Sequence, residues 1–343
     1  MYCIKEKIVL LILKKSYTGF IPARIRGRIF SLLFIFILTS LTIQAAPDST
    51  SISLGYPVYS QYLQNGLVIN PAYTGTRGAL SGFLSYRQQW IGTEGAPTLQ
   101  SVSLHAPFKN DKVALGLLGQ FMQYGYTKTS SIYASYAYHI RLARGKLSFG
   151  LKGGIDMSNS DFSKISTTTP GDKVFTNNDD PYILPNVGAG VYYFSEKLFA
   201  GFSVPQFLSY QKTGTNSVQS YHRFNDYDFI FSGGGLITFS DFFKFKPSVL
   251  IHYSLDEAEK FKQFDINGNF ILADIIWFGG SWRTNEEVVV GILQLQVTPQ
   301  LMFGFSYDYP VGRMSPPYST GSAEFALRYE FGSKVSAANP RYF

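Results

Sequence analysis

The stretch that decides the fold is K-L-S-F-G-L-K-G-G-I-D-M, residues 146–157. Starting from Leu147, every second residue is apolar or glycine, while the residues between are Lys, Ser, Gly, Lys, Gly and Asp. A strand alternates its side chains between two faces, whereas a helix would distribute them around its axis. The stretch therefore predicts an extended strand with one apolar and one polar face. Whether the apolar face meets a packed core or lipid decides the class of protein.

The same alternation recurs along most of the chain. Phe303, Phe305, Tyr307 and Tyr309 alternate with Gly304, Ser306 and Asp308, and the segments at residues 262–272 and 321–331 repeat the pattern. We predict fourteen strands, at residues 78–88, 98–108, 113–124, 127–141, 145–157, 184–194, 197–208, 226–239, 243–254, 262–272, 275–283, 287–297, 301–309 and 321–331. An even number of strands can close into an antiparallel barrel.

The composition favours a transmembrane β-barrel, with a soluble β-sandwich as the alternative. Aromatic residues make up 17% of the chain and charged residues only 15%, below the usual quarter of soluble domains. Beyond the first 45 residues, no run of eighteen apolar residues could form a spanning helix. Tyrosines at predicted strand ends suit the aromatic girdles of a barrel at the membrane interfaces, namely Tyr136, Tyr138, Tyr307, Tyr309 and Tyr329.

The connections between the predicted strands alternate in length. With the N-terminus taken as periplasmic, the periplasmic connections at residues 109–112, 143–144, 195–196, 240–242, 273–274 and 298–300 are all short. The opposite connections include long ones at residues 89–97, 158–183, 209–225, 255–261 and 310–320, although residues 125–126 and 284–286 are short. Barrels of the outer membrane have short periplasmic turns and longer external loops.

Residues 1–45 have the features of an export signal. Seven Lys and Arg residues against one Glu give this leader a charge of +6, so the total of +7 leaves about +1 for the rest of the chain. The apolar stretch at residues 29–43 and the small residues after it predict cleavage near Ala45. The nearly neutral remainder gives no indication of nucleic-acid binding. Cys3, the only cysteine, lies in the leader, which excludes disulfides from the exported chain.

Residues 56–76 neither alternate nor form a long helical pattern. Turn signals at Asn65-Gly66 and Asn70-Pro71 interrupt an aromatic segment, which needs a protected place to pack. We therefore predict a plug-like segment in the lumen or at the periplasmic mouth. The expected organisation is a leader at residues 1–45, an N-terminal periplasmic or plug segment at 46–77, the barrel at 78–331 and a periplasmic tail at 332–343.

Charged residues of the predicted strands fall on the polar face. The set consists of Lys152, Asp156, Asp308, Glu324, Arg328 and Glu330. A charge on the lipid face would cost about 2–4 kcal/mol near the midplane, so these side chains are expected to point inward. They can pair there with one another or with the plug segment, which predicts a filled, non-conducting lumen. His105 and His139 fall on the same face and are expected to form hydrogen bonds in the lumen.

No pattern in the sequence predicts catalysis, a cofactor or a metal ion. The histidines lack a metal-binding spacing, and no G-x-S-x-G motif occurs. Asp265-Ile266-Asn267-Gly268-Asn269 superficially resembles a calcium loop, but the glycine is misplaced and the acidic ligand at its end is missing. Gly233-Gly234-Gly235 lies within a strand, where a bend or a close backbone contact is the better interpretation.

An ordered set of short motifs resembles the PorP/SprF family. It consists of Tyr59-Ser60-Gln61-Tyr62, Asn70-Pro71-Ala72-Tyr73-Thr74-Gly75, Tyr86-Arg87-Gln88-Gln89-Trp90, Ser135-Tyr136-Ala137-Tyr138-His139 and Asn339-Pro340-Arg341-Tyr342-Phe343. The resemblance implies an outer-membrane component of the type IX secretion system of Bacteroidetes, with no catalytic residues. The candidate structural or interaction residues are Tyr59, Ser60, Gln61, Tyr62, Asn70, Pro71, Ala72, Gly75, Arg87 and Trp90.

Two functions follow as hypotheses. In the first, implied by the resemblance, the protein is a non-enzymatic scaffold that supports secretion or surface attachment of cargo. Some family members pair with large adhesins, whose C-terminal sorting domains they help to export or hold, and others relate to gliding. The outer loops would meet cargo, and the periplasmic turns and tail would meet the secretion machinery. In the second, a plugged barrel transports hydrophobic small molecules, which a continuous apolar passage with a lateral gap would favour.

Overall fold

A computed structural model describes residues 57–108, 111–161, 182–212, 218–221, 224, 227–255, 261–284, 286–312 and 319–332. The chain divides into two units, Met1–Ser51 and Ile52–Phe343, and every described residue belongs to the second. The predicted leader, nearly all of the predicted tail and most of the loops at residues 158–183 and 310–320 lie outside these ranges. No helix within these ranges is long and apolar enough to cross a membrane.

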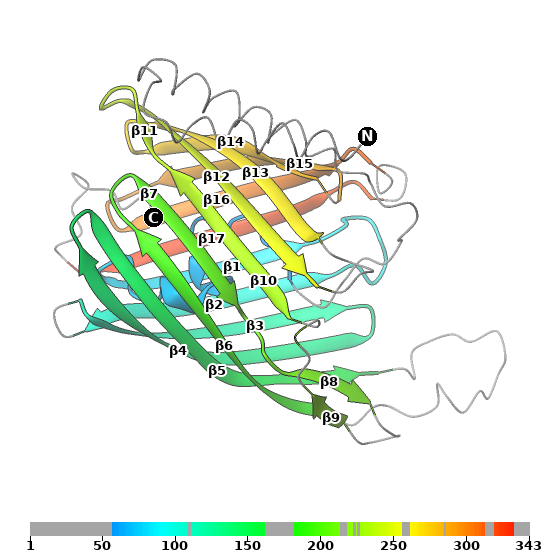
Figure 1. Cartoon of the computed structure of the whole chain (residues 1–343). Coiled ribbons are helices and arrows are strands. Elements are labelled where there is room, and N and C mark those ends of the chain that lie inside the picture. Colours follow the sequence, from blue (N-terminus) through cyan, green and yellow to red (C-terminus); the bar gives the residue numbers. More distant parts are fainter. Residues whose placement is uncertain are drawn as a thin grey trace, which may run out of the picture. The chain divides into compact units, whose positions relative to one another are not determined.

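The strands form one closed antiparallel sheet. The wall consists of β1 (Leu80–Gln88), β2 (Thr98–Phe108), β3 (Val113–Tyr124), β4 (Thr127–Leu142), β5 (Gly145–Ser160), β6 (Tyr182–Phe194), β7 (Leu198–Val204), β10 (Asp228–Gly235) with its continuation β11 (Ile237–Thr238), β12 (Phe243–Ser254), β13 (Phe261–Leu272), β14 (Ile276–Arg283), β15 (Val288–Gln296), β16 (Leu301–Pro310) and β17 (Ser322–Phe331). Each strand pairs with its neighbours in sequence, and β1 pairs with β17 to close the barrel (Figure 1). With β10 and β11 counted as one, the wall has the fourteen predicted strands.

One predicted strand is shorter than expected. Residues 197–208 were predicted as a continuous strand, but β7 ends at Val204, directly before a proline that cannot donate to the ladder. The chain then folds over β6, where Phe207 N donates to Val187 O over 3.0 Å. The predicted loop at residues 209–225 contains a hairpin, β8 (Ser209–Lys212) paired with β9 (Val218–Tyr221).

The three-glycine stretch produces the close approach that its sequence predicts. A Cβ at Gly234 would lie 2.6 Å from both Phe199 Cε1 and Pro247 O, so no larger residue fits without displacement. The strand is interrupted immediately afterwards, because Leu236 N leaves the β10–β12 ladder and donates to Lys197 O over 2.8 Å. Glycine therefore allows two neighbouring strands to approach where the wall bends.

The apolar set of each strand faces outward. On β5, Phe149 and Leu151 are 45% and 62% exposed, whereas Ser148 and Lys152 on either side of this pair are buried. Exposed large apolar side chains recur on nearly every wall strand, including Leu117, Ile132, Ile183, Ile266 and Leu293. Tyr136, Tyr138 and Tyr309 are also exposed, whereas Tyr307 and Tyr329 are partly buried. A closed sheet with such an exterior satisfies its backbone and meets hydrocarbon.

A charge placed on this outer face tests the assignment to lipid. Leu151 lies near the middle of β5, and Leu142 lies at the end of β4. We expect Leu151→Arg to lower the free energy of unfolding in a bilayer by about 2–4 kcal/mol, and the matched variant Leu142→Arg by about 0–1 kcal/mol, since the penalty depends on depth. Urea titration of the reconstituted protein measures both. Equal effects would contradict a bilayer that covers the middle of this face.

The two ends of the barrel differ in their connections. The tight turns after β4, β6 and β13 occur at the end where β1 begins, and the connection at residues 89–97 lies at the other. Short turns mark the periplasmic end of such barrels. The end where β1 begins and β17 finishes is therefore the periplasmic end, and the end near Gln88 and Ser322 is the outer mouth.

Candidate functional site

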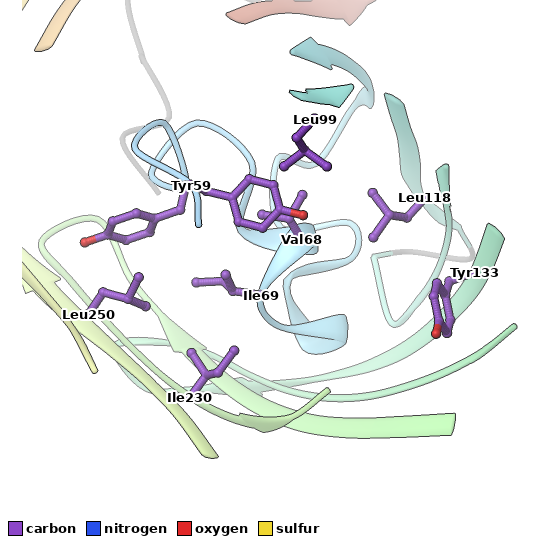
Figure 2. Close-up of a cluster of buried hydrophobic side chains, with 9 residues drawn as sticks. Tyr59, Val68, Ile69, Leu99, Leu118, Tyr133, Ile230 and Leu250 are labelled. Carbon is purple, nitrogen blue, oxygen red and sulfur yellow. The ribbon is translucent and has the colours of Figure 1, made fainter. Parts of the chain in front are cut away.

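Residues 57–77 lie inside the wall, and we call them the inner segment. The segment contains two short 3₁₀ helices, η1 (Gly66–Val68) and η2 (Pro71–Tyr73), which are fully buried. Figure 2 shows Tyr59, Val68 and Ile69 between wall residues of opposite sides, with Ile230 and Leu250 on one side and Leu99 and Leu118 on the other. An aromatic segment that lacks its own core therefore packs against side chains of the barrel interior.

Five charged side chains of the wall form a buried cluster near the outer mouth, which we call the outer cluster. Arg87 Nη2 lies 2.6 Å from Asp308 Oδ2, and Arg87 Nη1 lies 3.5 Å from Glu324 Oε2. Arg283 Nε lies 3.0 Å from Asp265 Oδ1, and its Nη1 lies 3.0 Å from Asp308 Oδ2. The side chain of Arg283 is 0% exposed. Two guanidinium groups therefore neutralise most of the charge of three carboxylates in a site closed to solvent.

Ser60 attaches the inner segment to the outer cluster. Its backbone N–H donates to Glu324 Oε2 over 2.8 Å, and its hydroxyl donates to Asp308 Oδ1 over 2.8 Å. Arg87 Nη1 in turn donates to Ser60 Oγ over 3.1 Å. These contacts place Ser60 and Arg87, two of the residues singled out in the sequence, at one site. Hydrogen bonds to charged groups are about twice as strong as neutral ones, so the attachment is firm.

The Asn70-Pro71-Ala72 motif seats η2 against the opposite wall. The Asn70 side chain accepts from Ala72 N over 2.9 Å and donates to the carbonyl of Val191 over 3.0 Å. Pro71 occupies the first position of the helix, where no donor is needed. The carbonyl of Ala72 accepts from Ser148 Oγ over 2.6 Å. The motif is thus a cap whose side chain also bonds to the barrel.

The end of the inner segment is fixed near the periplasmic end. Gly75 has a φ of +77°, which favours glycine, and its N–H donates to His105 Nδ1 over 2.9 Å. His139 Nε2 lies 2.9 Å from the carbonyl oxygen of Thr74. Arg77 Nη2 lies 2.6 Å from Glu330 Oε1. The prediction of lumenal hydrogen bonds for both histidines is confirmed.

The other singled-out residues lie at several levels of the lumen or at its mouth. Gln120 donates to the Tyr59 hydroxyl, and Asn267 Nδ2 donates to the Tyr62 hydroxyl over 2.7 Å. Gln294 Nε2 donates to Gln61 Oε1 over 2.8 Å. Trp90 lies beyond the end of β1, where its backbone N–H donates to Ser322 Oγ over 3.1 Å. Apart from Trp90, the ten singled-out residues therefore belong to the inner segment or to the wall that holds it.

Sequence reasoning did not identify Arg283 or Arg77 as members of the site. The signal for Arg283 was present, because Trp277, Ser281 and Arg283 alternate with outward residues along β14. Arg77 directly follows the recognised motif, but nothing in the sequence pairs it with Glu330, 253 positions away. The inward orientation predicted for Asp308, Glu324, Arg328, Glu330 and Lys152 is confirmed, since all are buried, and Asp156 accepts a hydrogen bond from Tyr133 in the interior.

A small cavity lies between the inner segment and the wall. A cavity of about 20 Å³ lies among Tyr62, Ile69, Tyr73, Tyr192 and Lys246, about the volume for one water molecule. A larger hollow of about 510 Å³ is on the outside, over Leu84, Val102 and Phe325. Within the described ranges, no group of His, Cys, Asp or Glu side chains has a metal-binding arrangement.

Several solved structures resemble the chain. They include the KdgM porin, with 10% identity and a TM-score of 0.35 over 74% of this chain and 99% of that one. They also include the Acinetobacter baumannii outer membrane protein Omp33, with 8% identity and a TM-score of 0.40 over 74% and 96%. The CymD monoaromatic hydrocarbon channel has 12% identity and a TM-score of 0.45 over 80% and 93%. None of the curated proteins compared matches the sequence.

The family comparison covers most of the chain. Residues 51–329 match the family described as type IX secretion system membrane protein PorP/SprF. The match includes the inner segment and nearly all of the wall, and so the residues that build the lumen. The resemblance inferred from the short motifs is confirmed. The chain therefore belongs to the PorP/SprF family and is an outer-membrane component of the type IX secretion system that associates with the secretion machinery.

Proposed function

We propose that the protein is a non-enzymatic scaffold that holds secreted cargo at the outer membrane through the C-terminal sorting domain of the cargo. The observation that carries this proposal is that the inner segment occupies the lumen and is bonded to the wall. The inner segment is bonded to the wall from Ser60 to Arg77, and one cavity between the segment and the wall has a volume of about 20 Å³. A barrel closed in this way acts through its surfaces rather than through a passage.

The two ends of the barrel offer different surfaces for this role. At the outer mouth, the turn at residues 89–97 is bonded to the two residues that precede β17, because Ile91 N donates to Gly321 O over 2.7 Å and Thr320 N donates to Ile91 O over 3.2 Å. A fixed outer rim suits docking of a folded sorting domain, since little order is lost on binding. The short turns at the other end suit contact with the periplasmic machinery. A cargo of the adhesin or gliding type fits the first surface.

Co-purification tests the proposal. The full-length protein, tagged at an outer turn and extracted in mild detergent, is expected to carry both a secretion-machinery subunit and the sorting domain of a cargo protein. The matched control is another outer-membrane barrel of the same cell, tagged and extracted identically. Recovery of machinery without any sorting domain would overturn the cargo role. Recovery of neither would remove the scaffold proposal.

Transport of hydrophobic small molecules is the second candidate. That function favours a continuous apolar passage and a lateral gap, whereas the described wall is hydrogen-bonded around its circumference and its inner face is mostly polar. We expect the purified protein to show no steady open pore in planar bilayers. Uptake of a hydrophobic compound that depends on this protein, with secretion unchanged, would favour transport instead.

A further inference from the structure

We infer that the polypeptide reaches the lumen from the outer mouth, so that Pro57 and Val58 face the outside of the cell while Arg77 lies at the periplasmic end. This inference concerns the direction in which the inner segment crosses the barrel. It stands independently of the secretion role proposed above.

Contacts to one wall strand, β17, show the depth at which each end of the inner segment is held. On β17, Ser60 N bonds to Glu324, the third residue from the outer end of the strand, and Arg77 bonds to Glu330, the residue next to its periplasmic end. Six residues along a strand span about 20 Å. The two ends of the inner segment are therefore held at different depths, with the N-terminal end nearer the outer mouth.

Contacts between these two ends follow the same order. Gln64 Nε2 lies beside Gly304, which pairs with Ala326 and so lies between the Glu324 and Glu330 levels. Farther along the inner segment, Ala72 O bonds to Ser148 near the start of β5, and Thr74 O bonds to His139 near the end of β4. Both positions adjoin the tight turn between β4 and β5 at the periplasmic end. These contacts place Thr74 nearer the periplasmic end than Ser60, which supports the same direction from the outer mouth to the periplasmic end.

The outer end of the inner segment is fixed by charge. Ser60 is held by Asp308 and Glu324, which are themselves paired with Arg87 and Arg283. Tyr59 and Ser60 are buried, whereas Pro57 and Val58 before them are partly exposed. Partial exposure therefore begins at the two residues that directly precede those held by the outer cluster.

Cysteine labelling on intact cells tests the direction. The full-length chain contains one native cysteine, Cys3, which is replaced by serine in all variants. Val58→Cys is compared with Glu94→Cys in the outer turn and Asp241→Cys in a periplasmic turn, both exposed positions. The probe is a maleimide joined to a polyethylene glycol too large to pass through porins. We expect Val58→Cys to react on intact cells as Glu94→Cys does, while Asp241→Cys reacts only after permeabilisation.

Two outcomes would overturn the inference. The first is reaction of Val58→Cys only after permeabilisation, as for the periplasmic control. The second is no reaction in either state while the denatured protein is fully labelled, since the position would then face neither mouth. Pro57→Cys is tested in parallel. If Val58→Cys fails to react only because its own side chain is buried, Pro57→Cys is still expected to react on intact cells. Secretion is measured in the same strains, so that failure of the proposed scaffold role and failure of the proposed direction can be told apart.

Discussion

Replacing Arg283 by methionine is expected to lower the free energy of unfolding by about 3–5 kcal/mol, because it leaves buried carboxylates without their partner. Arg283 is fully buried and contacts both Asp265 and Asp308. Methionine preserves part of the volume, so the loss reflects charge more than packing. Urea titration in detergent micelles, followed by tryptophan fluorescence, measures the effect.

Arg144→Met is the matched control, because Arg144 is exposed in the turn between β4 and β5. We expect it to change the free energy of unfolding by less than about 0.5 kcal/mol. Adding Asp265→Asn to Arg283→Met should recover part of the loss, since one unpaired carboxylate is removed. Equal midpoints for Arg283→Met and Arg144→Met would contradict a stabilising role for the outer cluster.

Gly150→Val is expected to displace the inner segment and open the lumen. A Cβ at Gly150 would lie 2.2 Å from Ala72 N and 2.4 Å from Pro71 C, and these are backbone atoms that cannot move alone. The seat of η2 must therefore be lost or the wall must distort. In planar bilayers, we expect conductance steps that the parent protein lacks, together with faster proteolysis within residues 70–77.

Gly153→Val, three residues along the same strand, is the control for Gly150→Val. A Cβ there would find its nearest neighbour, Val187 Cγ1, at 3.8 Å, which is ordinary contact. Valine also suits a strand. We expect this variant to fold and to remain closed. A folded, silent Gly150→Val protein would show that the inner segment does not close the lumen through this contact.

The strands of this protein could be predicted closely from the sequence. The predicted bounds at residues 98–108, 113–124 and 243–254 coincide with β2, β3 and β12. The β8–β9 hairpin was missed, since its two strands of four residues each are too short to establish a period. Most of the candidate site was also recognisable as motif residues and inward charges, but its pairings were not.

The sequence by itself determined the fourteen-strand barrel, its outward apolar face and its inward charges, because side-chain alternation is a local property of the backbone. Only the tertiary structure decided that Ser60 bonds to Asp308, 248 positions away, and that Arg283 joins them. Such pairs depend on the register of every strand between them and on the closure of β1 against β17. The depth at which each residue of the inner segment attaches is fixed by these registers together with that closure.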